Sequence, residues 1–272
     1  MYRRKPAVAG AFYPSNPQQL GGMIDNYLNE ARGASAAGTV VGLVSPHAGY
    51  IYSGPVAAFS FGQLEPDVNL AVVLAPSHRA RFNGAVVLPE GIYETPLGDV
   101  AIDSAIGAAL KDRKHFAAIT EAHELEHSLE VQVPFLQKVL NDFTIVPVIV
   151  GTGELDICSS IAGELHKALA GESRKLAVVV STDLSHYHSY DEARAMDGRF
   201  IEALESFDEN RVKSVIDSGQ AEACGEGPVL TGMVLCRLLG AGRVRILKYA
   251  NSGDTAGSRD QVVGYLAAAF VK

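Results

Sequence analysis

The chain has 272 residues, of which 47% are hydrophobic and 20% charged, and its formal net charge is −8. This composition indicates a folded globular protein and excludes a disordered chain, while the acidic balance argues against general nucleic-acid binding, which needs a basic face. The chain has three cysteines, a small and odd number that does not indicate a disulfide framework. The apolar runs are only strand length, and prolines and a glycine follow the basic start, so we expect a cytoplasmic protein that does not engage a membrane.

The predicted helices and strands alternate along the chain. Ser15 or Asn16 can cap a helix that begins at Pro17. We expect a kink or break at Pro134, inside a helical segment over 126–140. The remaining predicted elements are strands near 40–44, 70–74, 144–150, 176–181, 243–250 and 261–270, helices near 55–63, 102–112, 154–170, 190–205, 208–217 and 226–239, and a hairpin or edge excursion over 82–103. This order predicts one three-layer α/β/α domain over residues 1–272, with a mostly parallel central sheet.

Three of the predicted strands end within a few residues of a histidine: His47, His78 and His186. Such runs, apolar on both faces, are typical of buried parallel strands. Ligands of open α/β sheets bind beyond the carboxyl ends of the strands. The pattern therefore predicts three imidazoles at one edge of the sheet, in a site that binds a metal or performs acid–base chemistry. The alternative for each is a histidine that simply forms hydrogen bonds in a tight turn.

Two further positions can contribute to such a site. Asp183, three residues before His186, can orient that imidazole or tune its basicity. Alternatively, Thr182 or Asp183 caps a helix that contains His186 in its first turn. Cys224 precedes a predicted helix, where a thiolate is favoured, and could be a metal ligand, a nucleophile or a small buried hydrophobe.

The segment Glu126–Glu130 places His127 and Glu130 on one helix face. It lacks the second histidine of a His-Glu-x-x-His zinc site. Glu126 is predicted to face solvent, whereas His127 can point into a cleft. His115, His123 and His166 are predicted at the surface. Cys158 and Cys236 are predicted to be small buried hydrophobes within helices.

The chain resembles the Memo family, whose prokaryotic members are called AmmeMemoRadiSam system protein B. The resemblance extends over nearly the whole chain. One departure is Phe12, where tryptophan is more usual; we expect it to lie away from the site. The motifs that carry the resemblance, in order, are Arg4–Gly10 with Phe12–Pro14, Pro46–Tyr50, Pro76–His78, Glu126–Glu130, Ser181–Tyr187 and Cys224–Gly225.

The resemblance implies a fold similar to that of LigB-type extradiol non-haem iron dioxygenases. It places His47, His78 and Cys224 at the three metal-ligand positions, with iron favoured and copper or zinc as alternatives. Catalytic positions beside the metal would be Asp183, His186 as an acid–base residue, and His127. The dioxygenases have a carboxylate where this chain has Cys224, so the resemblance implies metal binding but not ring cleavage. Animal Memo proteins are described as iron- or copper-binding redox proteins and as binders of phosphorylated receptor peptides, and the family name suggests a functional link to a radical SAM protein.

Three functions remain open from the sequence. The first is a mononuclear metalloprotein with redox or oxygen chemistry. The second is a non-enzymatic module that binds a peptide or small ligand in the same cleft, with Arg79 and Arg81 available for an anion. The third is a metal-free hydrolase or transferase with Cys224 as nucleophile and His186 or His47 as base.

Overall fold

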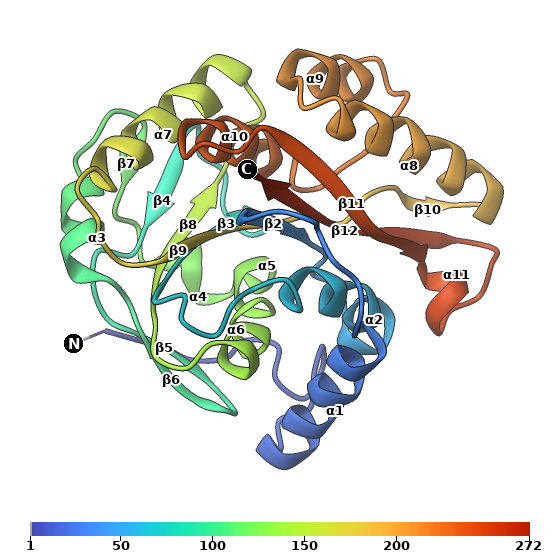
Figure 1. Ribbon diagram of the computed structural model, residues 1–272, viewed down its shortest axis with the longest axis horizontal. Coiled ribbons are helices and arrows are strands. Elements are labelled where there is room, and N and C mark those ends of the chain that lie inside the picture. Colours follow the sequence, from blue (N-terminus) through green and yellow to red (C-terminus); the bar gives the residue numbers. More distant parts are fainter. Residues whose placement is uncertain (1) are drawn as a thin grey trace.

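The computed structural model describes residues 2–272, and in this range nine strands form one central sheet (Figure 1). Their order is β10-β12-β2-β9-β3-β8-β4-β7, and β11 pairs with residues 264–271 of β12. The bounds are β2 Val40–Ser45, β3 Leu70–Pro76, β4 Ala85–Val87, β7 Phe116–Ala117, β8 Thr144–Val150, β9 Leu176–Ser181, β10 His186–His188, β11 Arg243–Asn251 and β12 Val262–Val271.

The four central strands, β2, β9, β3 and β8, are parallel. Every residue of β3 is buried, as expected for a Val- and Leu-rich strand covered on both faces. Outside this centre, β4 and β7 pair in parallel, whereas the pairings β12–β2, β11–β12, β10–β12 and β4–β8 are antiparallel. The parallel core therefore brings the carboxyl ends of β2, β3 and β9 to one edge.

Helices cover both faces of the sheet, which gives the predicted α/β sandwich (Figure 1). Neighbouring residues of one strand, such as Val72 and Val73, belong to the two different apolar clusters. One face carries α7 Leu155–Ala168, α8 Tyr190–Glu205, α9 Glu209–Asp217 and α10 Glu226–Leu238; the other carries α1 Pro17–Glu30, α2 Tyr50–Phe61, α5 His127–Glu130 and α6 Val133–Val139.

The remaining elements are short. A separate sheet contains β1 Arg3–Arg4, β5 Ile92–Thr95 and β6 Gly98–Ala101, so the predicted excursion over 82–103 divides between this sheet and β4. The remaining helices are α3 Ser104–Leu110, α4 Glu121–Glu124 and α11 Ser252–Thr255.

Most predicted elements are confirmed, and the exceptions have local causes. Asn16 caps α1 by accepting a hydrogen bond from the Gln19 amide. Helix α2 begins at Tyr50, five residues earlier than predicted, and Pro55 lies inside it rather than at its start. The segment 126–140 is broken into α5 and α6, and Pro134 is the second residue of α6, where its missing N–H is tolerated.

The region around His186 is not a helix. It forms β10, which pairs with β12, and the next helix begins at Tyr190. The Leu184 amide donates to the Gly264 carbonyl and the Gly264 amide to the Ser185 carbonyl, so the segment is attached to the sheet. This pairing overrides the helix cap considered for Thr182 and Asp183.

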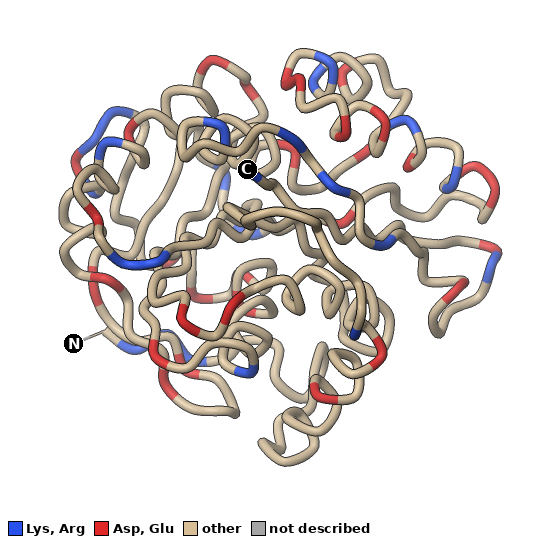
Figure 2. The backbone as a smooth tube through the Cα atoms, in the orientation of Figure 1, with Lys and Arg blue, Asp and Glu red and all other residues tan. Residues whose placement is uncertain are grey.

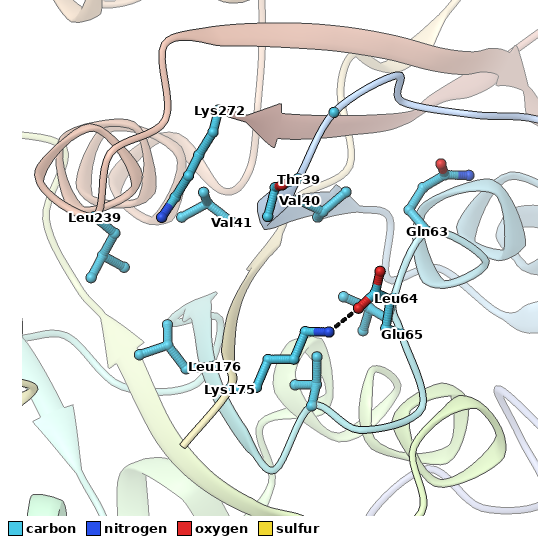
Figure 3. A pocket seen from close by; sticks show the side chains of 12 residues that line it. Thr39, Val40, Val41, Gln63, Leu64, Glu65, Lys175, Leu176, Leu239 and Lys272 are labelled. Atoms are coloured by element: carbon cyan, nitrogen blue, oxygen red, sulfur yellow. Dashed lines mark hydrogen bonds and ion pairs between the residues drawn. The ribbon is translucent and has the colours of Figure 1, made fainter. Parts of the chain in front are cut away.

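Charged residues are interspersed around the periphery, and the central strands carry few of them (Figure 2). Among the residues that the structure describes, no helix is long and apolar enough to cross a membrane. A cavity of about 300 Å³ lies at the amino ends of β2 and β9, where Lys175 forms an ion pair with Glu65 (Figure 3). The predicted site residues follow the opposite, carboxyl ends of these strands.

Candidate metal centre

Three histidines converge beyond the carboxyl ends of β2 and β3. His47 follows β2, His78 follows β3, and His127 is the first residue of α5. One ring nitrogen of each lies within 4.8 Å of those of the other two. The ring centroids are 5.2 Å apart for His47 and His78, and 4.8 Å apart for the stacked pair of His78 and His127. This group can hold a metal ion.

The hydrogen bonds of His47 determine which nitrogen faces the site. Its Nδ1 lies 2.8 Å from the Ser181 Oγ. That hydroxyl donates its proton to the Ser128 carbonyl, and accepts from the Gln132 amide. Ser181 can therefore only accept from His47, so Nδ1 carries the proton and the unprotonated Nε2 faces the Cys224 Sγ. Burial, reinforced by the neighbouring His78 and His127, lowers the pKa of His47 well below its usual value.

Glu126 orients the His78 ring as Ser181 orients that of His47. The prediction that Glu126 faces solvent is wrong. Rather than facing solvent, Glu126 is fully buried. Its Oε1 lies 2.9 Å from His78 Nδ1, and its Oε2 accepts the His78 amide at 2.5 Å. Although burial alone would raise the pKa of Glu126, hydrogen bonds from His78 and Ser128 lower it to about 2. The ionised carboxylate can only accept, so Nδ1 of His78 carries a proton, and in the neutral imidazole Nε2 is the nitrogen that can bind a cation.

His127 is the third member of the histidine group, and its side chain is mostly buried. Burial lowers its pKa to about 4, which makes its imidazole neutral at pH 7. Phe12 packs edge-on against it, with ring centroids 4.9 Å apart. The expectation that Phe12 lies away from the site is therefore wrong, because its ring packs against one of the three clustered histidines.

Cys224 lies directly against the cluster. Its Sγ is 3.1 Å from His47 Nε2 and accepts the Asp183 amide at 3.3 Å. Burial, with the nearby Asp183 carboxyl, raises the pKa of the thiol well above its usual range. Proximity to the start of α10 thus does not by itself produce the expected thiolate, because desolvation outweighs the helix terminus. A bound cation would reverse that balance.

Asp183 supports His47 rather than His186. Its Oδ1 accepts the His47 backbone amide at 2.7 Å, and its Oδ2 lies 4.0 Å from His47 Nε2. Burial raises the pKa of this carboxyl to about 7. The turn that carries His47 is therefore attached to the end of β9.

His186 is oriented by its own backbone. Its Nδ1 lies 2.7 Å from the Leu184 carbonyl, which can only accept, so Nε2 is again unprotonated. The His186 amide donates to Glu222. The ring is outside the three-histidine group, although its charge would be felt at His47. The structure thus places His186 beside the cluster rather than in it.

The three histidines predicted at the surface behave differently. His115 and His166 are half-buried, and both ring nitrogens of His166 lack a hydrogen-bond partner among residues 2–272. His123 is fully buried, with Nδ1 3.2 Å from the Tyr93 hydroxyl. The prediction for His123 is therefore wrong, because the N-terminal segment covers it through Arg4, which donates to its carbonyl.

Burial of His123 predicts a loss of stability in acid. Burial lowers its pKa to about 3, below the usual 6.5. Between these values the unfolded chain binds the additional proton, so the free energy of unfolding falls as pH drops below 6.5. At pH 5 this residue should cost about 2 kcal/mol. Urea unfolding at pH 7 and 5 should show a smaller loss for His123→Gln than for the natural chain; equal losses would contradict this account.

The donors at this edge suit a transition metal. Imidazole nitrogens and a thiol are intermediate to soft ligands, and Nδ1 hydrogen bonds to a carboxylate or hydroxyl are the usual support for metal-binding histidines. The fold and the site together define an α/β protein with a candidate metal centre at the carboxyl edge of its parallel strands.

Comparison with known proteins identifies the family. The family model for Memo-like protein matches residues 4–269. A MEMO1 family protein of Methanothermobacter thermautotrophicus is 38% identical over 96% of this chain and 98% of its own length. Similar proteins of Archaeoglobus fulgidus and Desulfurococcus amylolyticus, also called MEMO1 family proteins, are 38% and 36% identical over 98% and 99% of this chain, and over 99% of their own lengths. The chain belongs to the Memo family.

Proposed function

We propose that this protein binds one transition metal ion, with iron favoured over copper or zinc, and uses it for redox or oxygen-related chemistry. The observation that carries the proposal is the pair His47 and His78. Each ring has an acceptor on Nδ1, and each contributes one nitrogen to the three-histidine group, in which these nitrogens lie within 4.8 Å of one another. Preorganised ligands of this kind are costly to build and typical of metal sites.

Cys224 is the third ligand in this proposal. Its Sγ lies against His47 Nε2, and the Asp183 amide already donates to it, which stabilises a thiolate once a cation is bound. Metal binding would then release the thiol proton. His127, stacked on His78, remains a pocket residue or a fourth ligand.

The neighbouring groups can move protons. His186 has an unprotonated Nε2 and a fixed ring, as a general base requires. Asp183 holds the His47 turn in place and excludes water from that side of the ring. A bound iron or copper ion would supply electron transfer or oxygen activation.

The test is metal analysis of protein purified anaerobically. We expect about one ion per chain in the natural protein and in Cys236→Ala, whose thiol lies in the apolar core, and a large loss in His78→Ala and Cys224→Ala. Cobalt(II) loading separates the candidate third ligands: sulfur-to-cobalt charge-transfer absorption should disappear in Cys224→Ser and persist in His127→Ala. Negligible metal in the natural chain and in all variants would overturn the proposal.

The contact between Cys224 and His47 also satisfies the geometry of a thiol nucleophile with its base. We rank this second function lower. The raised pKa of the thiol opposes a reactive thiolate in the absence of a cation, and the orientation of His78 by Glu126 would serve no purpose in it.

A further inference from the structure

A second cavity, of about 300 Å³, adjoins the candidate centre on the Cys224 side. Three segments form its walls: the loop 76–82 after β3, the loop 150–153 after β8, and residues 223–228 at the start of α10. Cys224 lines it, and the Cys224 Sγ is 3.1 Å from His47 Nε2. Cys224 is therefore shared between the wall of this cavity and the candidate centre.

Arg81 lines this cavity and has no carboxylate partner among residues 2–272. Other arginines, such as Arg113, Arg174 and Arg237, pair with carboxylates. Arg81 is exposed and forms neither an ion pair nor a side-chain hydrogen bond with any residue from 2 to 272. The backbone beside it is fixed, because the Ser77 hydroxyl donates to the Ala80 carbonyl and accepts the Ala80 amide. The Arg81 guanidinium extends from this fixed backbone without a partner of its own, so it is available to an anion.

The other lining residues limit the kind of anion. Glu226 is the second charged side chain of the wall, and Lys213 neutralises it at 3.0 Å. Because Lys213 also pairs with Asp217, Arg81 is the one charged lining side chain without a partner among residues 2–272, and a single guanidinium matches a monoanion better than a phosphate dianion. The wall is mainly polar, and Phe82, Val150 and Pro228 supply its smaller apolar part, which suits a short hydrocarbon chain attached to an anionic group.

We propose that this cavity binds a small organic carboxylate whose carboxyl group pairs with Arg81 and whose apolar part extends toward Cys224. As a substrate site it rests on the proposed function, since the centre would perform the chemistry. The proposal that a carboxylate binds here depends only on the cavity and on Arg81.

The test uses hexanoate, its neutral isostere hexanamide and inorganic phosphate, added to metal-free protein and followed by backbone amide chemical shifts. Hexanoate should shift amides of residues 77–82 and 223–227 in a saturable way. Its affinity should fall about tenfold in Arg81→Gln, and less in Arg81→Lys. Arg245→Gln removes an exposed arginine of β11 that also lacks an ion pair among residues 2–272, and should change nothing.

Equal binding of hexanamide, unchanged hexanoate binding in Arg81→Gln, or binding of phosphate in place of hexanoate would each overturn the carboxylate proposal. Metal content is measured on separately loaded samples of the same variants. If hexanoate binds as expected but no metal does, the proposed function fails and the carboxylate site stands. If metal binds and hexanoate does not, the reverse holds.

Discussion

Replacing Arg4 by methionine should lower the free energy of unfolding by about 3–5 kcal/mol. Arg4 and Glu130 form an ion pair in which both side chains are fully buried. Removing the cation leaves the Glu130 carboxylate without its charge partner in the protein interior. The remaining donors, the Ala7 and Val8 amides and the Tyr13 hydroxyl, compensate only part of the lost interaction.

The effect should be large because Arg4 connects several segments. Its guanidinium also donates to the carbonyls of Lys5 and His123 at 3.0 Å and of Glu126 at 2.6 Å. These carbonyls belong to the N-terminal segment and to the loop that carries the candidate centre. Without Arg4 they lose donors in a region that excludes water, which adds to the cost.

Urea unfolding at pH 7 measures this, and the adjacent Arg3→Met is the matched control. Arg3 pairs with Glu94 and Asp99 on the surface, so its loss should change stability little. The double variant Arg4→Met/Glu130→Leu should recover much of the loss, because no unpaired charge remains. Equal destabilisation by Arg3→Met and Arg4→Met, or a double variant no better than Arg4→Met, would show that the buried pair is not what holds this region.

The sheet could be predicted from the sequence because its signal is local. An apolar run such as Leu70–Leu74 is recognisable within a few residues, and a histidine after it must lie near the sheet edge. The strand ends therefore placed His47 and His78 correctly. Cys224 came from family resemblance rather than from the strand pattern, and the structure places its thiol beside His47.

The residues that orient these histidines could not be predicted in the same way. Glu126 contacts His78 across 48 positions, and Arg4 contacts Glu130 across 126. Such contacts leave no periodic trace in a single sequence, and each charged residue alone is typical of a surface. One local signal existed for Glu126: its side chain also accepts the Ser128 amide and caps α5, a position where acidic residues are favoured.

Replacing Glu126 by glutamine should weaken metal binding about 10- to 100-fold, the usual cost of losing a residue that orients a metal-binding histidine. A glutamine amide is neutral and can donate as well as accept, so it no longer forces the proton of His78 onto Nδ1. The ring would then populate the tautomer whose Nε2 is protonated and cannot bind a cation.

Competition for zinc or cobalt against a chromophoric chelator measures the affinity, with unfolding curves to show that each variant is folded. Glu222→Gln is the matched control, because Glu222 accepts from the His186 amide and from His188 rather than from a proposed ligand. Glu126→Asp keeps the charge and should retain more affinity than Glu126→Gln. If Glu126→Gln bound metal as tightly as Glu222→Gln, the carboxylate would have only a structural role. We expect Glu126 to matter more for metal affinity than Ser181, which orients His47. A buried anion restricts His78 to one proton position, whereas the Ser181 hydroxyl restricts His47 only while the Ser128 carbonyl accepts its proton.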